Sequence, residues 1–201
     1  MIVTTIASTP TRIQAAGFGI LLAAAAVALG VLAGHLTLNG AEQAIGWAAT
    51  AVFAPLGLGL AVIDAREHRL PNLITLPLAA AMAIVVTAGA GVSGQWAALV
   101  QALLSGLGLG VVLMLVAMTG TLAFGDVKLG LSLGILTGWF SWTLPLTAVF
   151  AAYVLAMPHA LALLARKRRT EAPAAAGPTF MPMGPYLVAG ALLVTLATLL
   201  L

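Results

Sequence analysis

Residues Trp96–Thr119 have the sequence WAALVQALLSGLGLGVVLMLVAMT, and this stretch decides the class of fold because it contains no charged residue. The hydrocarbon core of a bilayer is about 30 Å thick, and a helix that rises about 1.5 Å per residue crosses it in about 20 residues. The stretch is therefore long enough to span a membrane. Within it, Gly106 and Gly110 form a Gly-x-x-x-Gly pair, which predicts a face where a neighbouring helix packs closely.

Similar apolar stretches occupy most of the chain. Of its 201 residues, 62% are hydrophobic and 6% are charged, whereas about 25% of the residues in a soluble domain are charged. We therefore predict an all-α, polytopic transmembrane helix bundle that forms one domain over residues 1–201. About seven spans are expected, within a range of about six to eight: Ile13–Gly34, Gln43–Ile63, Leu73–Gly91, Trp96–Thr119, Val127–Phe140, Leu144–Ala165 and Tyr186–Leu201. Residues 170–179 are predicted to form a cytoplasmic linker before the last span.

The basic residues predict the orientation in the membrane. Arg12 precedes the first span, and the other seven Lys and Arg residues lie in or beside alternate connections between the spans. An excess of such residues is typical of cytoplasmic loops. An N-in, C-out topology places all of them on the cytoplasmic side: Arg12, Arg66, Arg69, Lys128, Arg166, Lys167, Arg168 and Arg169. Because the net charge of +3 comes from these residues, it does not indicate nucleic-acid binding. An aromatic belt is expected near the outer ends of the spans, formed by Trp47, Trp96, Trp139 and Trp142.

Acidic residues are few, and two of them are placed for chemistry. Asp64 ends the second predicted span and Asp126 follows the fourth, and both spans run from outside to inside. The two carboxyl groups are therefore predicted to lie at the same depth, at the cytoplasmic end of the bundle. Two neighbouring carboxyl groups do not both ionise easily, so one pKa rises and the pair shares a proton. One group can then act as a base toward water while the other polarises a peptide carbonyl.

The position of these acids is also compatible with roles that involve no proteolysis. Both side chains could lie in the membrane interface and pair with Arg66, Arg69 or Lys128. They could relay protons in a small membrane transporter, although carriers usually bind near the midplane, or belong to a non-catalytic assembly component of a pilus or secretion system. The absence of cysteine excludes thiol catalysis and disulfides, and without clustered His ligands no metal site is predicted.

Three short motifs favour the protease among these alternatives. They are Asp64-Ala-Arg-Glu-His-Arg-Leu-Pro-Asn72, Phe124-Gly-Asp-Val-Lys-Leu129 and Met181-Pro-Met-Gly-Pro-Tyr-Leu187. Together, and in this order, they resemble the prepilin peptidases, or type IV leader peptidases, which are GxGD-type aspartic membrane proteases. The first resembles the family's Asp, five residues, then Ile/Leu-Pro-Asn/Asp. The second resembles Gly-x-Gly-Asp-x-Lys-Leu, and the third resembles the Pro-Phe-Gly-Pro-aromatic-Leu that precedes the final helix.

The resemblance implies a prepilin leader peptidase in the inner membrane of a bacterial cell, with its active site facing the cytoplasm. It implies hydrolysis of the peptide bond after the short basic leader of a type IV pilin-like precursor, with Asp64 and Asp126 as the catalytic dyad and no cofactor. The expected partners are this precursor and the lipid bilayer, and no oligomeric state is predicted. Residues at further motif positions are expected to bind substrate or shape the site: Gly125, Lys128, Pro71, Asn72, Gly184 and Pro185.

Physical reasons can be given for Gly125 and Pro71, whereas the role of Lys128 stays open. Gly125 leaves the approach to Asp126 free of a side chain, so that a substrate backbone can come close. Pro71 begins the third span, where its missing N–H costs little. For Lys128 three roles stay open: biasing the charge of the dyad, contacting a lipid phosphate, or holding the substrate.

The chain also departs from the family pattern. Ala123 stands in place of the first Gly of Gly-x-Gly-Asp, and Met183 stands in place of Phe in the third motif. Many family members carry an added methyltransferase region with paired cysteines, and this cysteine-free chain resembles the peptidase-only form. Of the histidines, His68 is interpreted as an interfacial residue and His159 as a packed, hydrogen-bonded residue beside a proline kink, while no partner is assigned to His35.

Overall fold

Six α-helices make up the part of the chain that the structure describes, and no strand occurs there. The computed structural model describes residues 40–67, 70, 72–120, 122–169 and 182–201. The helices are α2 (Gly40–Glu67), α3 (Asn72–Ser93), α4 (Trp96–Met118), α5 (Phe124–Gly138), α6 (Leu144–Arg169) and α7 (Gly184–Leu200). The all-α prediction is confirmed for these residues. The first predicted span, Ile13–Gly34, and the predicted linker, residues 170–179, lie outside them.

Four of these helices are long and apolar enough to cross a membrane. The apolar stretches cover Gly40–Glu67, Leu73–Ser93, Trp96–Met118 and Leu144–Leu163, on α2, α3, α4 and α6. Many of their large apolar side chains point outward, among them Ile84 (67% exposed) and Leu115 (62% exposed). A surface of this kind is stable in hydrocarbon rather than in water. The shorter α5 and α7, with 15 and 17 residues, complete the bundle.

Close approach of α4 and α5 depends on small residues. A Cβ placed on Gly106 would lie 2.6 Å from Ile135 Cγ1, and a Cβ on Gly110 would lie 2.6 Å from Leu131 Cδ2. On the facing helix, a Cβ on Gly134 would lie 2.7 Å from the Cα atom of Gly106. The Gly-x-x-x-Gly pair predicted from the sequence is therefore confirmed as a helix-packing face, and α5 is the helix packed against it.

Helix α5 forms the centre of the bundle. It contacts each of the other described helices, and every residue from Ser132 to Phe140 is buried. The indole of Trp139, at the end of α5, is 1% exposed, and its Nε1–H donates a hydrogen bond of 3.1 Å to the backbone oxygen of Glu42. The prediction that Trp139 belongs to an aromatic belt is therefore wrong. Its indole instead ties α5 to the first turn of α2, because a buried N–H needs an acceptor.

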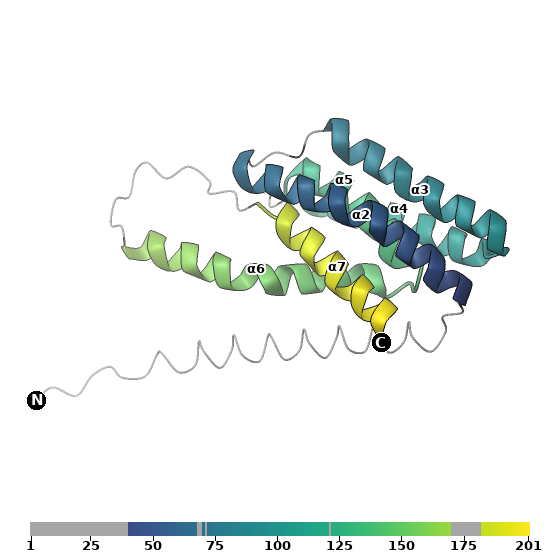
Figure 1. Cartoon of the computed structure of the whole chain (residues 1–201). Coiled ribbons are helices and arrows are strands. Elements are labelled where there is room, and N and C mark those ends of the chain that lie inside the picture. Colours follow the sequence, from purple (N-terminus) through teal and green to yellow (C-terminus); the bar gives the residue numbers. More distant parts are fainter. Residues whose placement is uncertain (1–39, 68–69, 71, 121, 170–181) are drawn as a thin grey trace, which may run out of the picture.

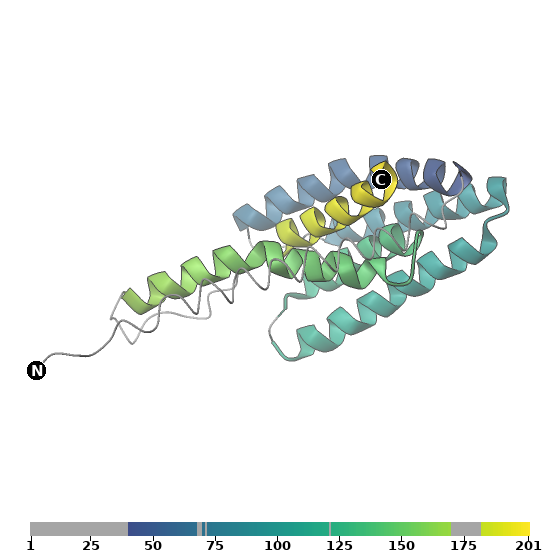
Figure 2. The same cartoon turned by 90° about the horizontal axis from the view of Figure 1, so that it is seen from below.

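Consecutive helices alternate in direction, as Figures 1 and 2 show. Short turns permit this alternation: Gly94 and Gly120 have φ angles of 75° and 77°, which glycine adopts without a steric penalty. As a result, the end of α2 and the beginnings of α5 and α7 lie at the same end of the bundle (Figure 1). This arrangement brings together three segments that are far apart in the sequence.

Candidate active site

Asp64 lies in the last turn of α2 and faces the beginning of α7. Its side chain is 6% exposed, and its Oδ2 atom accepts a hydrogen bond of 2.9 Å from the backbone N–H of Gly184. Gly184 is the first residue of α7, where backbone N–H groups have no partner within the helix. The partial positive charge at a helix N-terminus also stabilises a nearby carboxylate. The first turn of α7 therefore provides a binding position for the Asp64 carboxylate.

Gly184 and Pro185 suit this contact for steric reasons. A Cβ on Gly184 would lie 2.7 Å from Asp64 Oδ2 and 3.1 Å from Asp64 Cβ, so any larger residue would push the helix away. Pro185 occupies the first turn of α7, where the lack of an N–H costs nothing and the fixed φ favours the helix. The structure thus brings Gly184 to Asp64 and places Pro185 in the same helical turn.

Asp126 lies in the first turn of α5, not before that helix as the predicted span implied, because α5 begins at Phe124. Its side chain is 3% exposed, and Oδ1 has no hydrogen-bond partner among the described residues. Burial raises the pKa of Asp126 to about 7, and the charge of Asp64 acts in the same direction, while a hydrogen bond to the backbone of Ala123 lowers it. The two carboxyl groups therefore influence each other, as expected for a proton-sharing pair.

Ala123 fits its position although the family pattern has glycine there. Its backbone is extended, with φ −77° and ψ 144°, which any residue adopts, and its side chain is exposed. It serves as the N-cap of α5, and its oxygen accepts a hydrogen bond of 3.0 Å from the N–H of Asp126. The extra methyl group thus points away from the packed interior and leaves the turn that holds Asp126 intact.

The space beside Gly125 differs from the sequence-based expectation. A Cβ on Gly125 would lie 2.7 Å from Leu70 Cβ and 3.2 Å from Leu70 Cδ1. Leu70 is half-buried and packs against the hydrophobic core. Instead of an open approach for substrate, this position provides room for a leucine from the connection between α2 and α3. That contact links the first motif to the second.

The remaining predicted residues are placed as follows. Asn72 begins α3, and Pro71 and His68 lie outside the described residues. Lys128 is half-buried on α5, two residues after Asp126, a spacing at which side chains of a helix do not face each other. No group of three or more potential metal-ligating side chains gathers within the described parts of the chain.

The sequence did not indicate the hydrogen-bond partner of His159. His159 on α6 and Tyr186 on α7 share a hydrogen bond of 2.6 Å between Nδ1 and the phenolic oxygen, although 27 residues separate them. Their ring centroids are 6.1 Å apart. Tyr186 belongs to the third motif and His159 follows Pro158 in the sequence. No sequence pattern around either residue indicates that their side chains meet. The contact arises only when α6 packs against α7.

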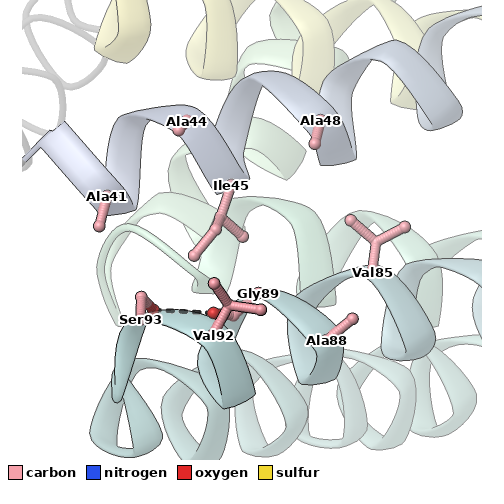
Figure 3. Close-up of a pocket in the computed structure, with 9 residues that line it drawn as sticks. All are labelled: Ala41, Ala44, Ile45, Ala48, Val85, Ala88, Gly89, Val92 and Ser93. Carbon is pink, nitrogen blue, oxygen red and sulfur yellow. Dashed lines mark hydrogen bonds between the residues drawn. The ribbon is translucent and has the colours of Figure 1, made fainter.

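An apolar groove of about 510 Å³ lies elsewhere, between the beginning of α2 and the end of α3 (Figure 3). Small side chains such as Ala44 and Ala48 line it, and its one hydroxyl group, on Ser93, donates a hydrogen bond of 2.8 Å to the oxygen of Gly89. The groove is near the opposite ends of these helices from Asp64 and Asp126. It therefore has no part in the chemistry of the two acids.

A comparison of the sequence with known protein families identifies the family of this chain. The sequence model of the type IV leader peptidase family matches residues 51–161, which is more than half of the chain. The chain belongs to the type IV leader peptidase family. The resemblance inferred from the three motifs is thus confirmed, and the family is one of proteases.

The family match also bears on the individual motifs. It includes Asp64, Asp126 and the parts of α2 and α5 around them, whereas the motif around Gly184 lies beyond its end. No curated protein and no solved structure matches the chain. In this leader peptidase family member, α7 contacts α2 through Gly184 and α6 through Tyr186.

Proposed function

We propose that this type IV leader peptidase family member is an aspartic endopeptidase that cleaves the basic leader from type IV pilin-like precursors. The observation that carries the proposal is the pairing of Asp64 and Asp126. Both side chains are buried at the same end of the bundle, and the charge of one raises the pKa of the other. Buried acids in a membrane protein are costly and commonly functional.

The environments of the two acids support different tasks. With a pKa of about 7, Asp126 keeps its proton below neutral pH, and the protonated form can donate a hydrogen bond to the substrate carbonyl. Asp64, which accepts the Gly184 N–H, can take a proton from water as that water attacks the carbonyl carbon. The tetrahedral intermediate then collapses and the C–N bond breaks. The leaving nitrogen takes up the proton that Asp64 removed from water.

The proposed site faces the cytoplasm in an N-in, C-out arrangement. Among the described residues, Arg66 lies in the last turn of α2, Lys128 lies near the start of α5, and the basic run Arg166–Arg169 ends α6. The end of α2, the start of α5 and the end of α6 point to the same side of the bundle (Figure 1), and an excess of Lys and Arg is typical of a cytoplasmic face. The proposal includes a first span at Ile13–Gly34, seven spans in one membrane domain, and location in the bacterial inner membrane.

The position of the acids also fits the substrate. A pilin-like precursor is expected to keep an apolar helix in the bilayer and its basic leader in the cytoplasm, so the scissile bond lies at the inner boundary. Asp64 is in the last turn of α2 and Asp126 is in the first turn of α5. In the proposed topology, both positions lie at the inner boundary of the membrane. A carrier that relays protons would need such acids nearer the midplane.

The test is processing of a precursor in membranes. A type IV pilin precursor with an intact leader is co-expressed with the wild type, Asp64→Asn or Asp126→Asn, and the precursor is followed by its change in size. Each variant should be inserted but inactive. Glu67→Gln is the matched control, because this exposed carboxylate lies one turn from Asp64 on the same helix and should be dispensable. Normal cleavage by either Asn variant would rule out the dyad.

A further inference from the structure

The first turn of α7 is held from two sides. On one side the N–H of Gly184 meets Asp64, and on the other the hydroxyl of Tyr186 meets His159 of α6. Both contacts come from residues only two positions apart. The turn therefore connects α6 to the proposed catalytic acid.

The turn behaves as one unit because its backbone is hydrogen-bonded. The N–H groups of Tyr186 and Leu187 donate bonds of 3.1 Å and 3.0 Å to the oxygen of Met183. Met183 is the N-cap residue and makes no side-chain cap hydrogen bond. Two polar contacts therefore tie this described turn to neighbouring helices: the N–H of Gly184 to Asp64 of α2, and the hydroxyl of Tyr186 to His159 of α6.

The contact with Asp64 tolerates little movement. A Cβ on Gly184 would already lie 2.7 Å from Asp64 Oδ2, so the backbone of α7 packs directly on the carboxylate. A shift of the turn by a few tenths of an ångström changes the length and angle of the 2.9 Å hydrogen bond. The function of Asp64 thus depends on where α6 holds α7.

We propose that His159 and Tyr186 are positioning residues for the proposed proteolysis: their hydrogen bond fixes the first turn of α7 so that the Gly184 N–H meets Asp64. Neither side chain contacts the acids in the described contacts, so each acts through α7. This inference rests on the proposed function of Asp64. It assigns to His159 a role that its sequence position beside Pro158 does not suggest.

The test uses purified enzyme in proteoliposomes with a full-length type IV pilin precursor as the probe. Tyr186→Phe removes only the hydroxyl, and His159→Ala removes its partner. Each should lower kcat by about three- to tenfold, as the loss of one hydrogen bond implies, and leave KM within about twofold. His159→Gln retains an acceptor for the hydroxyl and should recover most of the activity. Tyr153→Phe, at an exposed tyrosine on the same helix as His159, is the matched control and should be unchanged.

A double variant tests whether the two residues act as one unit. If they do, Tyr186→Phe combined with His159→Ala should be no slower than the slower single variant, whereas independent effects would multiply. Unchanged kcat in Tyr186→Phe, or multiplying effects in the double variant, would overturn the positioning role. Failure of the proposed function is recognised separately, by a wild type that does not cleave or an Asp64→Asn variant that does.

Discussion

Replacing Gly184 with alanine tests the contact on which the candidate site depends. The new Cβ would lie 2.7 Å from Asp64 Oδ2, which is about 0.7 Å inside the 3.4 Å at which ordinary van der Waals contact begins. If α7 retreats by that amount, the hydrogen bond lengthens from 2.9 Å to about 3.6 Å. At that distance no hydrogen bond remains.

The expected loss follows from the charge of the acceptor. A hydrogen bond to a charged group contributes about 1.5–3 kcal/mol. Because about 1.4 kcal/mol corresponds to a factor of ten, kcat/KM for precursor cleavage should fall about 10- to 150-fold in Gly184→Ala. Overpacking adds an expected decrease of about 1–3 kcal/mol in the free energy of unfolding.

The assay compares kcat/KM in proteoliposomes, with each rate divided by the amount of folded, inserted enzyme. Gly59→Ala is the control, because Gly59 is an exposed residue of α2 and a Cβ there meets nothing within 4 Å. That variant should match the wild type, with slightly higher helix stability. Cleavage by Gly184→Ala within twofold of the wild type would refute the idea that the Gly184 N–H supports Asp64.

Two further predictions concern the second motif. Since burial and the charge of Asp64 raise the pKa of Asp126 to about 7, Asp126 loses its proton as the pH rises through that value, and kcat/KM should then fall by about tenfold per pH unit. A pH–rate profile that stays flat to about pH 9 would contradict the role of Asp126 as the proton donor. Gly125→Ala places a Cβ 2.7 Å from Leu70 Cβ and should reduce both thermal stability and cleavage. Adding Leu70→Gly removes the Cβ that causes the clash and should restore much of the cleavage, whereas a double variant no better than Gly125→Ala would show that the defect has another origin.

Much of the bundle follows from local sequence. The stretch Trp96–Thr119 becomes α4 (Trp96–Met118) because an uncharged apolar run of that length has one stable conformation in a bilayer. Helices α2, α3 and α6 form for the same reason. Alternating helix directions then predict that the end of α2 and the start of α5 lie at one end, so the proximity of Asp64 and Asp126 was also predictable.

Contacts between helices were harder to predict. The burial of Trp139 under the first turn of α2 depends on which helix lies beside α5, and an apolar sequence allows many such neighbours. The same holds for Leu70, which fills the space beside Gly125 that we expected to stay open. Small residues marked the packing face of α4 correctly because Gly106 and Gly110 permit close approach wherever a partner helix is found.

Hydropathy and charge in this leader peptidase family member thus specify its helices, their alternating directions and the end of the bundle that carries two acids. They do so because the length of an apolar run and the cost of burying a charge are properties of a single segment. The hydrogen bonds from Gly184 to Asp64 and between Tyr186 and His159 join segments that are 120 and 27 residues apart. Such bonds depend on distances of tenths of an ångström between packed helices, and these are established only when the whole bundle is assembled.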